Sequence, residues 1–516
     1  MALADILILV SIVAYLAFMI VIGAVYTKQN KSSDVFYLGG RKLGPYVTAM
    51  SAEASDMSSW LLMGLPGLAL VAGLAEASWT AIGLAVGTYL NWLIVAKKIR
   101  FYSEKLGAVT VPDFFARRFR DNKKLLTIIA AVVIIVFFIP YTASGFSACG
   151  KLFNSLFGID YKVAMIVSGL VIVAYTTLGG FLAASFTDLI QSIIMTIALL
   201  VVLGYGVYYA GGVDVVLQNA QTLTSYLNLT TTHAAGSVAE AIAGTAGSAD
   251  YGFLPIVSTL AWGLGYFGMP HILLRFMAIE DASKLKVARR VGTIWVVISM
   301  AVAIIIGIVG YSVVKAGAIT NFADSERIIV ELAKLISGNG VIFALIAGVI
   351  LAGILASTMS TADSQLLAAA SSVSENLVSE AFKIKLSEKK KLIVARLAVV
   401  AISIIAMFIA TNENSSVFRV VSFAWAGFGA AFGPVILFAL FWKRTNKWGA
   451  LAGMVSGGAV VFIWKFIVRP LGGAWNIYEL LPAFIVACIA IVAVSLLTKE
   501  PEQEIVDEFE AVKAMK

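Results

Sequence analysis

The chain has 516 residues, of which 60% are hydrophobic and only 13% are charged, and its mean hydropathy is +0.93. These values exclude a soluble globular protein, and two cysteines and two histidines are too few for a disulfide framework, a metal cluster or a haem pair. The net charge of +8 is spread over alternate loops and therefore does not indicate a nucleic-acid-binding surface. The composition predicts an all-α polytopic membrane protein in a lipid bilayer.

Apolar runs of roughly 20 residues, long enough for a bilayer core of about 30 Å, recur along the whole chain. The first run, Ile6 to Ile22, lacks a basic start and a cleavage signal, so we interpret it as a retained helix and not a signal peptide. Thirteen spans are predicted, at 5–26, 45–75, 78–101, 124–155, 162–181, 185–211, 252–276, 287–316, 338–371, 391–411, 418–442, 447–469 and 478–498.

Basic residues gather in alternate loops between these spans. The basic loops are 27–44 (Lys28, Lys31, Arg41 and Lys42), 97–124, the loop after span seven from Arg275 to Arg290, the linker 383–391, and 443–447. The long segment 212–251 has no Lys or Arg and is expected to form a loosely folded external cap. Because basic loops favour the cytoplasm, we expect the N-terminus outside and the charged tail 499–516 inside.

The second span, 45–75, is interrupted at its midpoint by the stretch SAEASDMSS. Hydroxyl groups can bond back to their own helix, but Glu53 and Asp56 need another explanation. A carboxylate at mid-membrane costs about 2.5–3.5 kcal/mol and usually faces a cavity or a partner. We therefore expect span two to be broken there and to line a binding cavity.

The seventh span, FLPIVSTLAWGLGYFGMPHILLRF, contains three glycines and two prolines that weaken a continuous helix. Close packing of helices through small residues is the alternative explanation for the glycines. Spans two and seven each begin a block of five helices, and paired interrupted helices in matching positions are typical of transporters built from inverted repeats.

The predicted divisions of the chain are 1–44, the first repeat 45–211, the external loop 212–251, the second repeat 252–442, helices twelve and thirteen at 443–498, and the tail 499–516.

The ninth span carries hydroxyl groups on one helical face, at Ser357, Ser360, Thr361 and Ser364, with Asp363 beside them. Hydroxyl and carbonyl oxygens without several carboxylates suit Na⁺ better than a divalent ion. Hydrogen bonds within the helix are the alternative. The sixth span adds Asp188, either a coupling-ion ligand or a structural hydrogen-bond partner.

Four stretches together resemble the sodium/proline symporters of the solute:sodium symporter family. They are GGRKLGPYVTAMSAEASDMSSWLLMGLPG, WGLGYFGMPHILLRFMA, the MST of span nine and FAWAGFGAAFGPVILFALFW, and the resemblance extends from about Gly39 to Leu497. It implies the five-plus-five inverted-repeat fold of the leucine transporter, with broken helices two and seven. It also implies sodium-coupled uptake of L-proline across the cell membrane.

The family roles transfer to matching positions of this chain. The resemblance implies sodium binding by carbonyl groups of Ala54, Met57 and Ser357 and by the hydroxyls of Ser360 and Thr361, with Asp56 as a nearby acid. It implies a proline site at Ser58, Trp60, Tyr141, Trp262, Tyr266 and Pro270, and places Arg41 at the cytoplasmic end of the sodium path.

Three residues depart from the family pattern. Glu53 and Asp363 stand where small residues are expected, and Ser59 replaces an expected glycine. Some relatives hold a second sodium ion at the positions of Asp188, Ser360, Asp363 and Ser364. We therefore expect a second cation or a proton near Asp188 and Asp363, unless Asp363 bonds a neighbouring helix.

Other functional classes lack their signatures. A channel needs a continuous polar path, a sensor needs an output domain, and an intramembrane enzyme needs a nucleophile–base pair or a metal motif. We expect no catalytic residue, no organic cofactor and no obligatory protein partner. Within transport, a different solute (another amino acid, a betaine-like osmolyte, pantothenate or a sugar) and coupling to protons are the alternatives.

Overall fold

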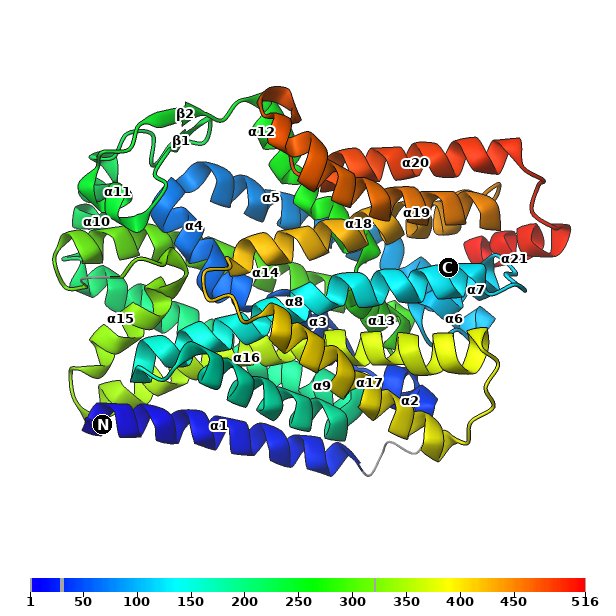
Figure 1. Ribbon diagram of the computed structural model, residues 1–516, viewed down its shortest axis with the longest axis horizontal. Helices are drawn as coiled ribbons and strands as arrows, with labels where there is room; N and C mark the ends of the chain where they lie inside the picture. The colour runs from blue at the N-terminus through cyan, green and yellow to red at the C-terminus, as the bar shows by residue number, and fades with distance from the viewer. Residues whose placement is uncertain (1, 28–31, 320–321, 516) are drawn as a thin grey trace.

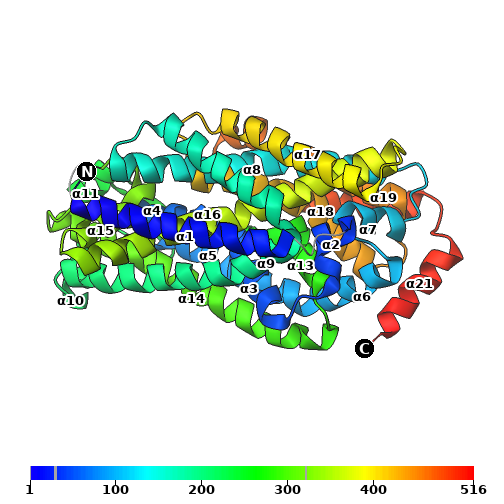
Figure 2. The same ribbon diagram turned by 90° about the horizontal axis from the view of Figure 1, so that it is seen from below.

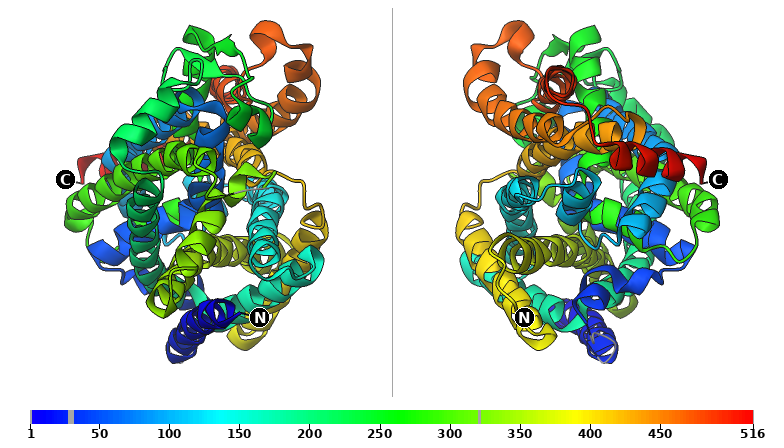
Figure 3. Two further views of the ribbon diagram at one scale, coloured as in Figure 1. Left: turned by 90° about the vertical axis from the view of Figure 1, so that its left-hand side faces the viewer. Right: turned by 90° about the vertical axis from the view of Figure 1, so that its right-hand side faces the viewer.

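The computed structural model describes residues 2–27, 32–319 and 322–515, and these are overwhelmingly helical. Lys28 and Lys31 of the predicted first basic loop lie outside the described residues. The long helices run side by side along one direction, and the two termini lie toward opposite ends of the bundle (Figures 1 and 2). Figure 3 looks along this direction and shows the bundle end-on.

The elements of the first half are α1 (Leu3–Thr27), α2 (Ser33–Leu38), α3 (Pro45–Asp56), α4 (Leu65–Ala72), α5 (Leu74–Leu90), α6 (Ala96–Leu106), α7 (Val111–Arg118), α8 (Leu125–Phe157), α9 (Tyr161–Tyr209), α10 (Val213–Gln221), β1 (Thr231–His233), α11 (Val238–Ala243) and β2 (Ser248–Asp250). Those of the second half are α12 (Phe253–Leu260), α13 (Pro270–Ala278), α14 (Leu285–Lys315), α15 (Ile328–Ser337), α16 (Val341–Ser371), α17 (Glu388–Ile409), α18 (Val417–Phe441), α19 (Lys447–Ile463), α20 (Leu480–Leu497) and α21 (Gln503–Ala514).

Within the described residues, ten helices are long and apolar enough to cross a membrane. Shorter apolar helices cover Trp60–Ala72, Tyr161–Thr177 and Phe253–Gly268. The membrane-spanning helical class is confirmed, whereas helix length alone does not confirm the count of thirteen. The predicted fifth and sixth spans join in α9, which changes direction at Gly180 (φ 66°, ψ −172°), a conformation that favours glycine.

The predicted break in span two is confirmed. Helix α3 ends at Asp56, and Met57 (φ −75°, ψ 70°) leaves the helical conformation before a new helical segment begins at Trp60. The Met57 amide still donates to the Glu53 carbonyl at 2.8 Å, which closes the last turn of α3. Carbonyl groups beyond that turn are released from the helix.

The predicted break in span seven is also confirmed. Helix α12 tightens into a three-residue-per-turn segment, Ala261–Gly268, and Met269 is extended before α13 starts at Pro270. The glycines also pack closely, since a Cβ on Gly263 would meet the Gly83 carbonyl of α5. Both explanations of these glycines therefore hold.

Helix α16 lies at the centre of the bundle and packs against α1, α3, α8 and α9. Its residues from Ile350 to Ser371 are all buried. A helix surrounded on every side can carry a row of hydroxyl groups without exposing them to lipid. The hydroxyl face predicted for span nine thus faces other helices.

The segment 212–251 is not the loosely folded cap that its composition suggested. It contains α10, α11 and a small antiparallel sheet in which Thr231 of β1 lies opposite Asp250 of β2. The Ser237 hydroxyl accepts from the Glu240 amide and caps α11. The order comes from local caps and strand pairing, which an average composition does not reveal.

The charged tail forms an amphipathic helix, α21, which the sequence analysis did not predict. Its apolar residues Ile505, Phe509 and Val512 recur at helical spacing and are buried. Glu508 lies 2.7 Å from Arg120 Nη2, so an ion pair supports the same contact.

Candidate functional site

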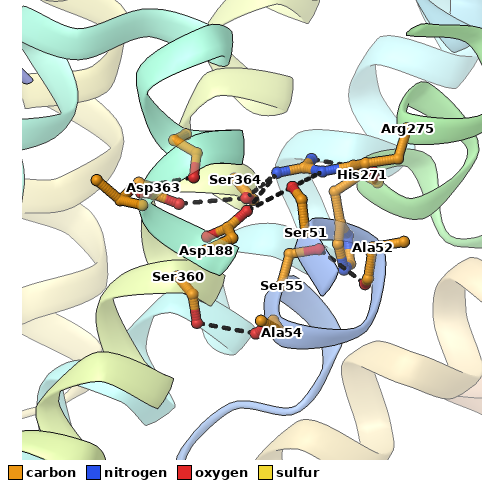
Figure 4. Close-up of polar contacts among 12 residues, drawn as sticks. Ser51, Ala52, Ala54, Ser55, Asp188, His271, Arg275, Ser360, Asp363 and Ser364 are labelled. Atoms are coloured by element: carbon orange, nitrogen blue, oxygen red, sulfur yellow. Dashed lines mark hydrogen bonds and ion pairs between the residues drawn. The ribbon is translucent and has the colours of Figure 1, made fainter. Parts of the chain in front are cut away.

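A set of oxygen atoms joins the end of α3 to the middle of α16. The Ser360 hydroxyl lies 2.8 Å from the Ala54 carbonyl oxygen, toward which it donates, and 3.2 Å from that of Ser357 (Figure 4). One hydroxyl proton cannot satisfy both carbonyl groups fully. The Thr361 hydroxyl is buried and has no hydrogen-bond partner among the described residues. The Ala54 carbonyl at the end of α3 and the hydroxyls of Ser360 and Thr361 are uncharged oxygens that fit a small hard cation such as Na⁺.

Met57, the remaining predicted sodium ligand, lies at the break and is fully buried. The structure therefore brings Ala54, Ser357 and Ser360 into contact. Met57 is buried directly after α3, and Thr361 is buried on α16.

Asp56 connects this oxygen set to the aromatic residues predicted for the substrate. Its carboxylate Oδ2 accepts from the Tyr266 hydroxyl at 2.6 Å, across the two broken helices. Its backbone carbonyl accepts from Trp60 Nε1 at 3.0 Å and from the Tyr141 hydroxyl at 3.2 Å. Three predicted substrate residues thus surround the end of α3.

The other predicted substrate residues lie at the two breaks. The Ser58 hydroxyl accepts from the Trp60 amide at 3.4 Å. Pro270 is buried at the first turn of α13, where Met269 provides no side-chain cap. The first amide groups of α13 are therefore available to an anionic group.

Trp262 forms an aromatic layer with Phe418 and Tyr478, two residues that sequence analysis did not single out, and it also lies near Trp60. Its ring lies 6.3 Å from Trp60, 5.3 Å from Phe418 and 5.1 Å from Tyr478, between ring centroids. Trp425 Nε1 donates to the Trp262 carbonyl at 2.7 Å. Trp425 lies in the motif FAWAGFGAAFGP, whose aromatic residue was the available signal.

A cavity of about 1560 Å³ reaches this layer from one end of the bundle. Trp262, Phe418 and Tyr478 contribute to its lining, as do Ser237 and Val238 of the segment 212–251. The cavity therefore opens on the side that the charge pattern predicts to be external. The aromatic layer separates it from Trp60, which is buried.

Arg275 lies inside the bundle, beside the predicted second cation site, and not in a loop. From the sequence, Arg275 was expected in a basic loop, because it lies near the predicted end of span seven. The structure corrects this assignment: Arg275 belongs to α13, and its side chain is 1% exposed. Its Nη2 lies 3.2 Å from Asp188 Oδ2 and donates to the Ser364 hydroxyl at 2.5 Å (Figure 4). Asp188, Asp363 and Ser364 are thus together, as predicted, but around a guanidinium.

Arg41 contacts the end of α13 that lies away from the cavity. Its guanidinium donates to the carbonyl oxygens of Met277 at 2.6 Å and Ala108 at 2.7 Å, and to the Ser103 hydroxyl at 3.1 Å. Arg41 therefore links the end of α13 to the turn after α6, at the end of the bundle away from the cavity.

Glu53 bonds to the third span through one carboxylate oxygen, and its other oxygen, Oε2, is buried without a hydrogen-bond partner among the described residues. Its Oε1 accepts from Trp92 Nε1 at 2.6 Å and from the Thr88 hydroxyl at 2.9 Å. The carboxyl group that departs from the family pattern thus braces α3 against α5 and the segment that follows it.

Two interrupted membrane helices, with an oxygen site at one break and aromatic residues between them, define a transporter with a leucine-transporter-type core. The sodium:solute symporter family model matches residues 36–457, and the chain belongs to this family.

Curated relatives match almost the whole chain. A high-affinity proline transporter of Bacillus subtilis is 43% identical, with 95% of this chain and 98% of the relative covered. A sodium/proline symporter of Haemophilus influenzae is 43% identical, with 98% of each chain covered. The solved structure of a Na⁺-coupled sialic acid symporter, in a substrate-bound outward-open state, matches with a TM-score of 0.77 at 18% identity. It covers 96% of this chain and 99% of its own, and this likeness confirms the fold.

Proposed function

We propose that this protein transports L-proline together with Na⁺ into the cell by alternating access. The contact between Ser360 and Ala54 carries the proposal, because it brings a hydroxyl and a carbonyl oxygen together near the break of span two. Asp56 joins that site to the aromatic residues through Tyr266. The names of the relatives, proline transporter and sodium/proline symporter, support the same ion and solute.

The chemistry of the buried residues suits proline. A pyrrolidine ring packs on aromatic faces, and its secondary ammonium is attracted by the rings of Trp60, Tyr141 and Tyr266. Its carboxylate suits the uncapped amide groups at the start of α13, after Met269. The assigned residues are Ser58, Trp60, Tyr141, Trp262, Tyr266 and Pro270 for proline, and Ala54, Met57, Ser357, Ser360 and Thr361 for Na⁺, with Asp56 between the two sets.

The coupling follows from the shared helix. Na⁺ at the junction of α3 and α16 fixes the end of α3 and thereby prepares the pocket around Asp56. Such coupling is reciprocal, so Na⁺ and proline raise each other's affinity by the same factor. A membrane potential of 100 mV supplies about 2.3 kcal/mol per charge, which permits roughly 50-fold accumulation for each Na⁺.

The conformation supports entry from the cavity side. The cavity reaches Trp262, whereas Arg41 ties α13 to the loop after α6 at the opposite end. With the cavity external, the N-terminus is outside, the C-terminus is cytoplasmic, and Arg41 lies at the cytoplasmic end of the sodium path. Release then requires these Arg41 contacts to open.

The direct test is uptake of labelled L-proline into proteoliposomes that contain the purified protein. We expect accumulation with an inward Na⁺ gradient and none with K⁺. Accumulation of another solute in its place, or accumulation driven by a proton gradient alone, would contradict the proposal. Uptake of labelled betaine, pantothenate and glucose into the same proteoliposomes would identify the other solute.

A further inference from the structure

His271 is the second residue of α13, and its side chain is completely buried. Neither ring nitrogen, Nδ1 nor Nε2, has a hydrogen-bond partner among the described residues. The backbone of the same residue is paired, since its carbonyl accepts from Arg275 Nη1 at 2.9 Å. Buried polar groups normally have a partner, because an unpaired one costs stability. The imidazole therefore needs a partner that the described residues do not supply.

The imidazole lies where three helices meet. Figure 4 shows the side chain of His271 pointing toward the end of α3, where Ala52 and Ser55 lie. The centroid of its ring is 5.7 Å from that of Phe138 on α8. Phe138 is three residues before Tyr141, so the two share one face of α8. The ring of His271 is therefore close to residues that we propose for the ion and the solute.

The start of α13 offers backbone N–H groups beside this ring. Met269 is extended and provides no side-chain cap, and Pro270 occupies the first position of the helix. The Leu273 amide donates to the Met269 carbonyl at 3.0 Å, so the amides of His271 and Ile272 precede the first hydrogen bond of the helix. Such amides attract a carboxylate. One turn of α13 thus combines anion-binding N–H groups with an unpaired imidazole.

A zwitterionic imino acid matches both parts of this turn. In proline the secondary ammonium and the carboxylate are attached to the same carbon atom, so a group beside the carboxylate also reaches the ammonium. A neutral imidazole has one acceptor nitrogen and one N–H donor. The acceptor nitrogen can accept from an ammonium N–H, whereas aromatic rings attract the charge without requiring an N–H. A fully methylated ammonium has no N–H and cannot make this contact.

We propose that a ring nitrogen of His271 binds the secondary ammonium of proline while the first amides of α13 bind its carboxylate. His271 then determines specificity, because it favours solutes with an ammonium N–H over betaine-like solutes. This proposal rests on the proposed symport of sodium and proline. It adds a residue that the sequence analysis did not assign to the substrate.

The first test compares two solutes in one variant. His271→Leu removes both ring nitrogens and keeps an apolar side chain in the buried position. We expect its KM for L-proline to rise about 10- to 100-fold. The inhibition constant of N,N-dimethyl-L-proline, which has no N–H, should stay near the wild-type value. His233→Leu is the matched control, because His233 in β1 is the other histidine of the chain and is also buried, and it should leave both constants unchanged.

Equal losses for the two solutes, or an unchanged KM for proline in folded His271→Leu, would overturn the proposal. A second measurement does not require that variant to fold. The wild-type protein with ¹³C-labelled histidine would be studied in membranes with ¹⁵N-labelled proline and Na⁺. A hydrogen bond brings the two nitrogen atoms to about 3 Å, so we expect strong dipolar coupling between proline and one histidine ring.

The two histidines give two sets of ring signals, and the His233→Leu protein identifies the set that belongs to His271. Bound proline without coupling to the His271 ring would overturn the proposal and leave the symport intact. Wild-type protein that neither binds proline nor accumulates it with a Na⁺ gradient would contradict the symport itself.

Discussion

The hydroxyl of Tyr266 donates to the carboxylate of Asp56 at 2.6 Å and so joins the two broken helices directly. Asp56 closes α3, next to the proposed sodium site, and Tyr266 belongs to the tightened segment before α13. The contact therefore lies between the ion and the solute in the proposed mechanism.

Tyr266→Phe is expected to weaken sodium-dependent proline transport without unfolding the protein. The change leaves Asp56 Oδ2 without its donor, and a hydrogen bond to a charged group contributes about 1.5–3 kcal/mol, or roughly 10- to 100-fold in affinity. The measurement is the KM for proline at several Na⁺ concentrations. Tyr205→Phe is the control, because the Tyr205 ring packs on Phe343 while its hydroxyl makes no hydrogen bond to the described residues. Equal KM values in both variants would contradict a coupling role for this contact.

Ser360→Ala is expected to raise the half-saturating Na⁺ concentration about tenfold, because one ligand and its hydrogen bond are lost. Proline affinity at saturating Na⁺ should stay near the wild-type value. Ser371→Ala is the control on the same helix, since the Ser371 hydroxyl bonds only to the Ala368 carbonyl of α16. Sodium titration of proline uptake gives both values, and similar curves for the two variants would argue against the proposed ion site.

Gly263→Ala tests the close packing of span seven against α5. A methyl group there would meet the Gly83 carbonyl, and overpacking costs about 1–3 kcal/mol. We expect a lower melting temperature of the purified protein and reduced uptake. Gly204→Ala of α9, where a Cβ has nothing within 4 Å, should retain both. A stable, active Gly263→Ala protein would show that this glycine serves only to weaken the helix.

Glu326→Gln is expected to destabilise the rim of the cavity. The carboxylate of Glu326 lies 2.8 Å from Lys151 Nζ and accepts from the Val417 and Phe418 amides at the start of α18, both at 3.1 Å. Lys151 is 2% exposed and keeps Asp324, at 2.8 Å, as its remaining ion-pair partner, and we expect a loss of about 1–3 kcal/mol in stability.

Thermal unfolding of the purified protein measures this loss. Glu413→Gln is the control, because the Glu413 side chain is exposed and forms no hydrogen bond or ion pair with the described residues. An unchanged melting temperature in Glu326→Gln would mean that the pair contributes nothing to stability.

Sequence patterns alone were sufficient to predict the class of the protein and its two interrupted helices. The hydropathy pattern predicted the membrane-spanning helices, because a segment in lipid must satisfy its backbone N–H and C=O groups by internal hydrogen bonds. Carboxyl groups inside an apolar run, as at Glu53 and Asp56, marked a segment that lipid does not surround. The three- and four-residue spacing of the hydroxyl groups around Ser360 indicated which face of span nine lies toward the break in span two.

The contacts between polar groups of different helices could be identified only from the way the helices pack. Sequence placed Arg275 in a loop, because a charge near the end of an apolar run normally marks the membrane surface. In the bundle it lies between Asp188 and Ser364, where paired groups offset the desolvation of its charge. Trp425 and Tyr478 likewise lie far from Trp262 in the chain but contact it in the fold. Such contacts join residues that are far apart in the chain, and a local sequence pattern contains no information about how distant helices pack together.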